Sequence, residues 1–228
     1  MSEATNALGQ AKYQVRFDWG VEGAARILPG AHIVVLVDAL LATTLAVVAA
    51  EHGETFAVSA HAGGDAARDA AGTETAAIAE ALAGHDVVVL AASLRNREAV
   101  ARRVLALQEA RGERLLVAVV AAGERAGADE SADAAASGGG IRFAIEDQLT
   151  AGAVIDALVR LGIDHTSPEA AVACAAFEGL QHAAVHLISA SGSGARLAEA
   201  GRKPDARLAT QRDVTDLVPV LREGVFGA

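Results

Sequence analysis

The sequence predicts a three-layer α/β/α protein in which helices cover both faces of a largely parallel sheet. Three continuous apolar segments rich in β-branched residues predict buried strands at 33–38, 86–92 and 115–121. Alanine-rich segments with helical character lie between them, and strands that alternate with helices over short connections are typical of parallel sheets. Polar residues come directly after each predicted strand, so we expect a functional site where the strands end.

The helices are predicted at 43–52, 74–83, 96–111 and 145–161. The last of these has the clearest apolar repeat, near the 3.6 residues of a helical turn, and Gly162 provides a stop signal. A further helix is expected after Ser167, which is a suitable N-cap, with Pro168 in the first turn. The segment 217–221 contains Pro219 and predicts a short strand at the edge of the sheet.

A chain of 228 residues suits one domain, which we place at 13–228. Residues 1–12 are expected to form a disordered tail, and the glycine-rich segment near 127–140 a flexible loop. The apolar fraction is 52%, but the longest apolar stretches fall well short of the ~18 residues that a membrane span needs. The first residues lack the pattern of a signal peptide, so we expect a cytoplasmic protein with no membrane partner.

The formal net charge of −10 argues against nucleic acid as a partner, because a polyphosphate backbone would be repelled. Cys174 is the only cysteine, which excludes an internal disulfide, and its apolar neighbours predict a buried structural residue. The sequence contains neither a Walker A motif nor a GxGxxG motif after a strand. Nucleotide binding therefore has no support from motifs.

The first predicted strand ends at Asp38, and Thr43 and Thr44 follow in the next turn. A carboxylate in this position could bind a hard cation, and the hydroxyl groups could contact a substrate. The alternative is an ordinary helix cap, which would need only one of these residues.

The second strand is followed by Ser93, Arg95 and Asn96. Their hydroxyl, guanidinium and amide groups could together hold an oxyanion. Capping of the next helix by Ser93 or Asn96 is the simpler alternative, but it leaves the rest of the group unexplained.

The third strand leads through Gly123 to Glu124 and Arg125, which form either part of a site or a solvated ion pair. Beyond the glycine-rich segment come Arg142 and, at the start of a helix, two acidic residues. The acidic residues are Glu146 and Asp147. They could simply interact with the helix dipole. Combined with Asp38 and Glu124, however, they would form the oxygen-rich set that Mg²⁺ prefers.

Taken in order, several segments of the chain resemble the 2-phosphosulfolactate phosphatase (ComB) family. The most specific is AGER at 122–125, followed by Arg142 and EDQLTAGA from 146 onward. The other matching segments are 17–20, 37–44, 191–192 and 218–226. The resemblance therefore extends over nearly the whole chain.

This resemblance implies a three-layer α/β fold and magnesium-dependent hydrolysis of 2-phospho-3-sulfolactate to sulfolactate and phosphate, a step toward coenzyme M. On this interpretation Asp38, Glu124 and Arg125 carry the catalysis, with Glu124 as the preferred general acid or base. Mg²⁺ would be held by four carboxylates: Asp38, Glu124, Glu146 and Asp147. The substrate would be bound by Thr43, Thr44, Ser93, Arg95, Asn96 and Arg142.

Two alternatives stay open: a non-catalytic protein that binds small anions, and a hydrolase of a different small acidic substrate. The apolar C-terminal segment makes a homodimer possible.

The chain departs from the family pattern at Leu41, where relatives commonly have arginine. We expect Leu41→Arg to raise activity toward 2-phospho-3-sulfolactate by restoring an anion contact. Alternatively, Leu41 has become a packing residue and Arg95 holds the anion, in which case the substitution would bury an unpaired charge.

Overall fold

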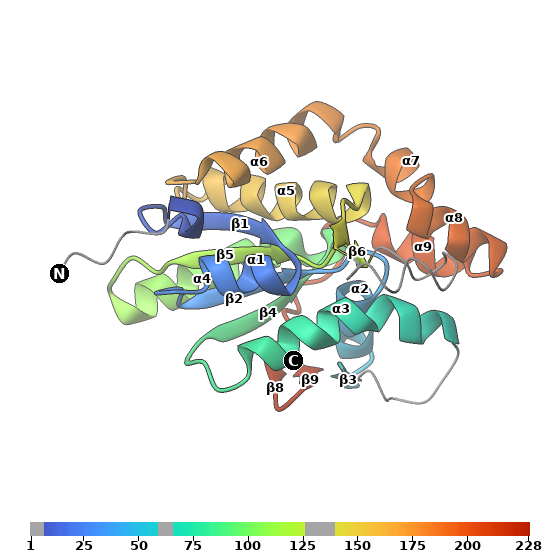
Figure 1. The fold of residues 1–228 in the computed structure, drawn as a ribbon, viewed down its shortest axis with the longest axis horizontal. Helices are drawn as coiled ribbons and strands as arrows, with labels where there is room; N and C mark the ends of the chain where they lie inside the picture. Colours follow the sequence, from blue (N-terminus) through green and yellow to red (C-terminus); the bar gives the residue numbers. More distant parts are fainter. Residues whose placement is uncertain (1–6, 59–65, 126–139) are drawn as a thin grey trace.

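The computed structural model describes residues 7–58, 66–125 and 140–228, and it contains a seven-stranded mixed sheet flanked by helices (Figure 1). Four neighbouring strands are parallel: β1 (Val15–Trp19), β5 (Val117–Ala121), β2 (Ile33–Val37) and β4 (Val88–Ala92). Antiparallel pairing then adds β8 (Val220–Arg222), β9 (Val225–Gly227) and β3 (Phe56–Ala57). A separate two-stranded ribbon consists of β6 (Glu124–Arg125) and β7 (Ile141–Arg142). The predicted fold class is confirmed.

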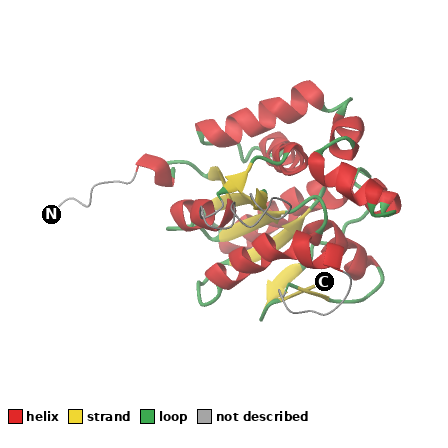
Figure 2. Ribbon diagram, turned by 45° about the vertical axis from the view of Figure 1, so that its right-hand side comes forward, coloured by secondary structure: helices red, strands yellow, loops and turns green. Residues whose placement is uncertain are grey.

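Alternate residues of the parallel strands pack on opposite faces of the sheet, because side chains along a strand point to each side in turn. Val35 and Val119 belong to a core that includes residues of three helices, which are α4 (Arg97–Arg111), α5 (Ile145–Arg160) and α6 (Pro168–Leu180). Leu36 and Val120 face a second core shared with α1 (Gly20–Ile27), α2 (Ala42–Glu51) and α3 (Ala66–Leu82). Figure 2 shows helices on both sides of the strands. The three layers therefore follow from strands that are apolar on both faces.

A third apolar cluster lies beyond the carboxyl ends of the parallel strands, under three short helices at the right of Figure 1. The helices are α7 (Ala184–Ser189), α8 (Gly192–Glu199) and α9 (Lys203–Ala209). Leu41 and Phe177 lie in this cluster, together with Leu94 of the short 3₁₀ helix η2 (Leu94–Asn96). The cluster attaches the C-terminal helices to the edge of the sheet where the predicted site lies.

The predicted strands and helices agree with the structure within a few residues, except that α3 begins eight residues earlier than predicted. The start of α6 is confirmed, since the Ser167 hydroxyl accepts a hydrogen bond of 3.1 Å from the Ala170 amide. The prediction of an edge strand at 217–221 is wrong. β8 is interior to the sheet, between β4 and β9. Pro219 lies just before it and still takes part in the pairing with β4, since its carbonyl oxygen accepts from the Ala91 amide at 2.9 Å.

Residues 7–12 are folded, so the predicted disorder does not extend over them. They include the short helix η1 (Ala7–Gly9). Gln10 is buried and makes two hydrogen bonds with the backbone of Phe17, donating at 2.8 Å and accepting at 3.0 Å. The remainder of the predicted tail and nearly all of the predicted loop near 127–140 lie outside the described residues. None of the described helices is long and apolar enough to cross a membrane.

Candidate active site

The ends of β2 and β5 lie side by side, because these strands pair in parallel with Val37 opposite Ala121. Asp147, in the first turn of α5, bridges the two ends. Its Oδ1 accepts a hydrogen bond of 2.7 Å from the Ala39 amide, and its Oδ2 accepts one of 2.8 Å from the Gly123 amide. The segments after both strands and the start of α5 are thereby held around one acidic centre.

Asp38 is buried at this centre, with 5% of its surface exposed. The Thr75 hydroxyl, on α3, donates to its Oδ2 at 2.6 Å. Burial is the main reason why the pKa of Asp38 is raised to about 7, and the nearby charges of Glu146 and Glu124 act in the same direction. The hydrogen bonds from Thr75 and from the Ala42 amide favour the ionised form and offset only part of this effect.

Glu146 and Asp147 are as deeply buried as Asp38, each 3% exposed. Burial first, and then the charges of Asp38 and Glu146, raise the pKa of Asp147 well above its ordinary value. In the described part of the chain, no arginine or lysine pairs with any of the three carboxyl groups. Buried like charges of this kind are stable only if they hold protons or a cation. The donor chemistry of this set fits Mg²⁺, which prefers carboxylate oxygens.

Glu124, at the start of β6, forms the second half of the site. Its carboxylate accepts hydrogen bonds from the Ser193 hydroxyl and from the guanidinium groups of Arg142 and Arg196. Burial acts to raise its pKa, but the bonds from Ser193 and Arg142 and the charges of both arginines outweigh it, so the pKa of Glu124 is lowered. Glu124 is therefore ionised at neutral pH and holds two guanidinium groups in place.

The two guanidinium groups are accessible to a ligand, since the side chains of Arg142 and Arg196 are 55% and 49% exposed. Arg142 passes over Gly192 at the start of α8, where a Cβ atom would lie 2.8 Å from its Nη2. Ser191 caps this helix by accepting from the Gly194 amide at 3.0 Å. Arginines bind phosphate, sulfonate and carboxylate through paired N–H groups. The site thus combines a buried acidic centre with a half-exposed pair of arginines.

We expect Gly192→Ala to displace Arg142 and to weaken the binding of an anionic substrate, with KM rising roughly tenfold because one charged interaction is removed. Stability should change little, because alanine is favourable in a helix. The measurements are KM and the melting temperature. Gly179→Ala, in α6, is the matched control, since a Cβ atom added at Gly179 has no neighbour within 4 Å. An unchanged KM would show that Arg142 does not contact the substrate.

Comparison with known proteins supports the chemistry that this geometry suggests. The family model of 2-phosphosulpholactate phosphatase matches residues 69–224, about two thirds of the chain. The chain belongs to this family. None of the curated proteins compared with it matches. The matched segment contains Glu124, Arg142, the acidic pair of α5 and Arg196, whereas Asp38 precedes it. The family is one of phosphatases, so this protein is a phosphoric monoester hydrolase.

Thr43 and Thr44 are fully buried in this phosphatase and serve the turn after β2. The Thr43 hydroxyl lies 2.8 Å from the carbonyl oxygen of Asp38 and 2.7 Å from that of Ala92, and it accepts from the Asp38 amide. The Thr44 hydroxyl donates to the Ala39 carbonyl at 2.8 Å. The structure therefore places both hydroxyl groups beneath the site, where they fix the position of Asp38, and does not support their predicted contact with a substrate.

Ser93 and Asn96 form a reciprocal cap on η2. The Ser93 hydroxyl accepts from the Arg95 amide at 3.2 Å, and the Asn96 side-chain oxygen accepts from the Ser93 amide at 2.9 Å. The Asn96 amide group also donates to the carbonyl oxygens of Ala91 and Leu217. The capping alternative accounts for both residues, so nothing in this arrangement leaves them free to bind a substrate.

Arg95 lies away from the acidic centre. Its guanidinium group pairs with both carboxylate oxygens of Glu51, at 2.7 and 2.9 Å, and also contacts Gln211. Glu51 is the last residue of α2, whereas Asp38 precedes its first turn, and a helix of this length spans about 15 Å. The structure thus separates the Arg95 guanidinium group from Asp38, whereas Arg142 and Arg196 both contact Glu124.

For Arg125 the structure describes only the backbone, which pairs with Ile141 in the β6–β7 ribbon. Its predicted catalytic role stays a prediction.

Sequence reasoning missed Thr75, Ser193 and Arg196. Thr75 lies in an alanine-rich helix that gave no sign of a site. A serine followed by glycine, as at Ser191 and Gly192, is a helix-start signal that could have pointed to the helix that carries the other two.

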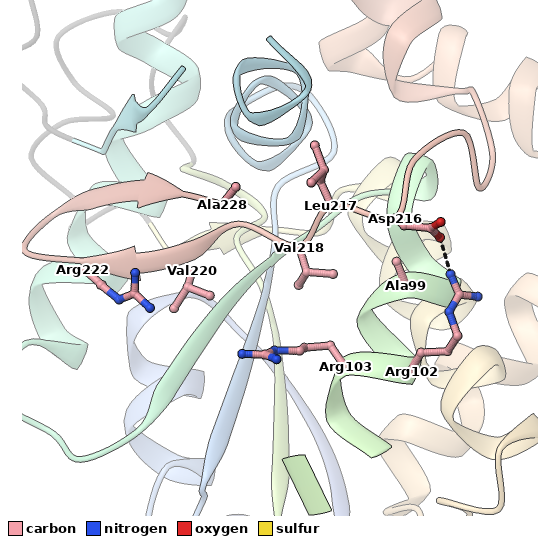
Figure 3. A pocket seen from close by; sticks show the side chains of 9 residues that line it. All are labelled: Ala99, Arg102, Arg103, Asp216, Leu217, Val218, Val220, Arg222 and Ala228. Carbon is pink, nitrogen blue, oxygen red and sulfur yellow. Dashed lines mark hydrogen bonds and ion pairs between the residues drawn. The ribbon is translucent and has the colours of Figure 1, made fainter. Parts of the chain in front are cut away.

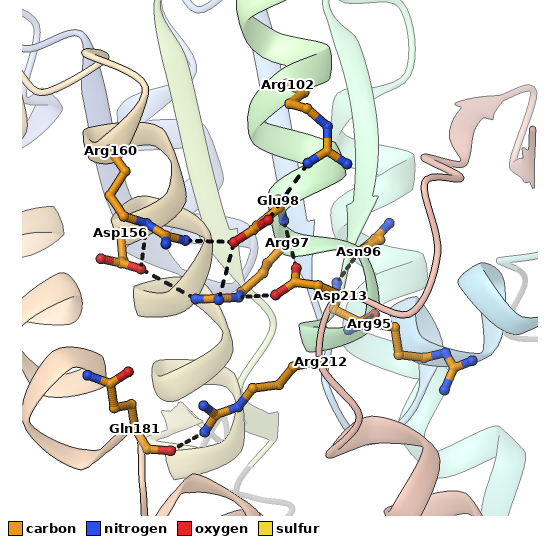
Figure 4. Close-up of polar contacts among 11 residues, drawn as sticks. Arg95, Asn96, Arg97, Glu98, Arg102, Asp156, Arg160, Gln181, Arg212 and Asp213 are labelled. Carbon is orange, nitrogen blue, oxygen red and sulfur yellow. Dashed lines mark hydrogen bonds and ion pairs between the residues drawn. The ribbon is translucent and has the colours of Figure 1, made fainter.

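A second group of possible metal ligands lies between α5 and α6, where atoms of Asp156, Cys174 and Glu178 are within 4.8 Å of one another. Asp156 already pairs with Arg97 at 3.3 Å and with Arg160 at 3.4 Å (Figure 4). Burial, then Glu178 and Asp156, raise the pKa of Cys174 to about 11. Cys174 is buried, as the sequence predicted, and its thiol holds a proton at neutral pH, so it is unreactive.

Proposed function

We propose that this phosphatase hydrolyses 2-phospho-3-sulfolactate, or a closely related small anionic phosphomonoester, to the alcohol and phosphate with the help of Mg²⁺. The observation that supports the proposal most strongly is the pairing of two sets of opposite charge. Asp38, Glu146 and Asp147 form a buried acidic centre, and beside it Arg142 and Arg196 are held half-exposed by Glu124. Hydrolysis of this substrate would place the enzyme in a route toward coenzyme M.

The carboxyl groups of the acidic centre and of Glu124 have two different roles. Asp147 accepts from two backbone amides and Glu124 accepts from three side-chain donors, so both are committed to holding the site together. Among the described residues no hydrogen bond engages the Glu146 carboxyl group, and that of Asp38 accepts only from Thr75 and the Ala42 amide. Glu146 and Asp38 would hold Mg²⁺, with Asp147 supporting them. The bound ion would supply positive charge for the phosphoryl oxygens and would acidify a water molecule.

The arginine pair would bind the anionic groups of the substrate. 2-Phospho-3-sulfolactate carries further acidic groups close to its phosphate, and two neighbouring guanidinium groups match this arrangement. In the loose transition state of phosphoryl transfer, fixed positive charges stabilise the oxygens of the transferred group. Because its pKa is lowered, Glu124 is better suited to orient the two arginines than to act as the general acid or base expected from the sequence.

We expect the purified protein to release phosphate from 2-phospho-3-sulfolactate with Mg²⁺ and to lose this activity in excess chelator. Two substrates test the arginine pair: 2-phospholactate lacks the sulfonate, and β-glycerophosphate lacks both the sulfonate and the carboxylate. kcat/KM should fall in that order, by roughly tenfold for each acidic group that the substrate lacks.

Other results would favour the alternatives. Equal turnover in chelator would contradict the metal-dependent mechanism. Preference for another phosphoester would identify a different hydrolase. Saturable binding without any phosphate release would identify a non-catalytic binding protein.

A further inference from the structure

A groove of about 450 Å³ lies between α4 and β8 (Figure 3). Its size is within the range of small-molecule sites. Arg102 and Arg103 line it from α4, while Val218, Val220 and Arg222 line it from the segment of β8. None of these residues belongs to the candidate active site.

The groove exists because the helical layer ends at α4. β8 packs against β4 and β9, and among the described helices none packs closely over it. Val218, Val220 and Arg222 are spaced two residues apart and so point to the same face of the sheet. The two valines are partly buried against the core beneath α4. They give the groove an apolar floor with Arg222 at its far end.

The arginines of the groove are not equivalent. Arg102 pairs with Asp216 at 2.5 Å and lies 3.8 Å from Glu98. Arg103 and Arg222 are exposed, and within the described residues neither has an ion pair or a side-chain hydrogen bond. Figure 3 shows the Arg103 side chain extending along the groove toward the side where Val220 and Arg222 lie. Three arginines line the groove against Asp216 and the terminal residue Ala228, so the groove carries an excess of positive charge in a chain of net charge −10.

We propose that this groove binds a small organic dianion, such as a dicarboxylate, whose acidic groups contact Arg103 and Arg222 and whose carbon skeleton lies on Val218 and Val220. Guanidinium groups pair with carboxylates through two N–H donors, and the valines provide the apolar contact that an inorganic anion would not use. β8 runs antiparallel to β4 with Val220 opposite Leu90, so Arg222 lies toward the amino end of β4. The phosphatase site lies at the opposite, carboxyl end of the parallel strands, and this groove is therefore a separate site.

The test is an NMR titration of the ¹⁵N-labelled full chain with succinate, succinamide and inorganic phosphate, without Mg²⁺. Succinate should produce saturable shifts of the Val218 and Val220 amides and of the Nε–H signals of Arg103 and Arg222. Succinamide, its neutral counterpart, should produce none. Phosphate should bind at least roughly tenfold more weakly, because it gains nothing from the valines. If succinate bound at the phosphatase site instead of the groove, the amide signals of Ser193 and Gly194 would shift and those of Val218 and Val220 would not.

Arg103→Gln and Arg222→Gln should each raise the dissociation constant for succinate roughly tenfold. Both residues are exposed, so the variants should fold normally. Arg114→Gln, at an exposed arginine outside the groove, should leave the constant unchanged. The proposal would be overturned by non-saturating shifts, by equal binding of phosphate and succinate, or by variants that bind as the wild type does.

Discussion

Asp38→Asn should lower phosphate release by at least about tenfold and, at pH 8 in chelator, raise the melting temperature. Both effects have the same origin, since a carboxylate buried beside Glu146 and Asp147 is useful only when a cation or a proton neutralises it. The folded-state pKa of Asp38 is about 7, above the ordinary value of 3.8. Its favourable contribution to stability is therefore fully present below about pH 4 and is lost as the pH rises through 7.

A pKa shift of this size corresponds to a loss on the order of 4 kcal/mol between pH 4 and pH 8, and sharing of protons with Asp147 reduces the part that belongs to Asp38 alone. Asparagine has no charge to bury and can still accept from the Thr75 hydroxyl. The gain of the variant over the wild type should thus be small at pH 5 and largest at pH 8.

Thermal unfolding at both pH values, with Mg²⁺ and with chelator, measures these effects. Mg²⁺ should raise the melting temperature of the wild type at pH 8 and have a much smaller effect on the variant. Asp164→Asn, at an exposed position, is the control. If Asp38→Asn kept full turnover, or were less stable than the wild type at pH 8, Asp38 would be a structural residue of the turn and not part of the catalytic centre.

Leu41→Arg should destabilise the protein by about 3–5 kcal/mol and bring no gain in activity. This reverses the expectation from the family pattern. Leu41 is 1% exposed and packs in the apolar cluster with Leu94 and Phe177. A guanidinium group there would be buried among the apolar side chains of this cluster. For a chain of this size, a loss of that magnitude lowers the melting temperature by roughly 10 °C.

Leu41→Met conserves volume and should cost less than about 1.5 kcal/mol, which makes it the matched control. Comparison of melting temperatures and of kcat/KM for the two variants separates the possibilities. A Leu41→Arg protein that melted like the wild type and hydrolysed 2-phospho-3-sulfolactate faster would show that position 41 still faces the substrate. The packing role inferred from the structure would then be wrong.

The sequence by itself determined the layers of the fold and the edge at which the site lies. Continuous β-branched segments such as 33–37 can be stable only in a sheet covered on both faces, and parallel strands bring the residues that follow them to one edge. Asp38, Glu124 and the acidic pair of α5 were predicted on this ground, and the structure does bring them together. Local sequence signals were sufficient to predict these positions, because helix caps and strand ends depend on residues close in sequence.

Tertiary structure alone decided which polar groups face the site and which are used elsewhere. Arg95 is paired with a residue 44 positions away, and Arg196 meets Glu124 across 72 positions. Likewise, β1 was not predicted because Arg16 interrupts its apolar pattern. That arginine is 1% exposed and donates to the carbonyl oxygens of Ile27 and Pro29, at 2.9 and 2.7 Å. A guanidinium group can be buried or can bind an anion according to which acceptors surround it, and packing supplies those acceptors from distant parts of the chain.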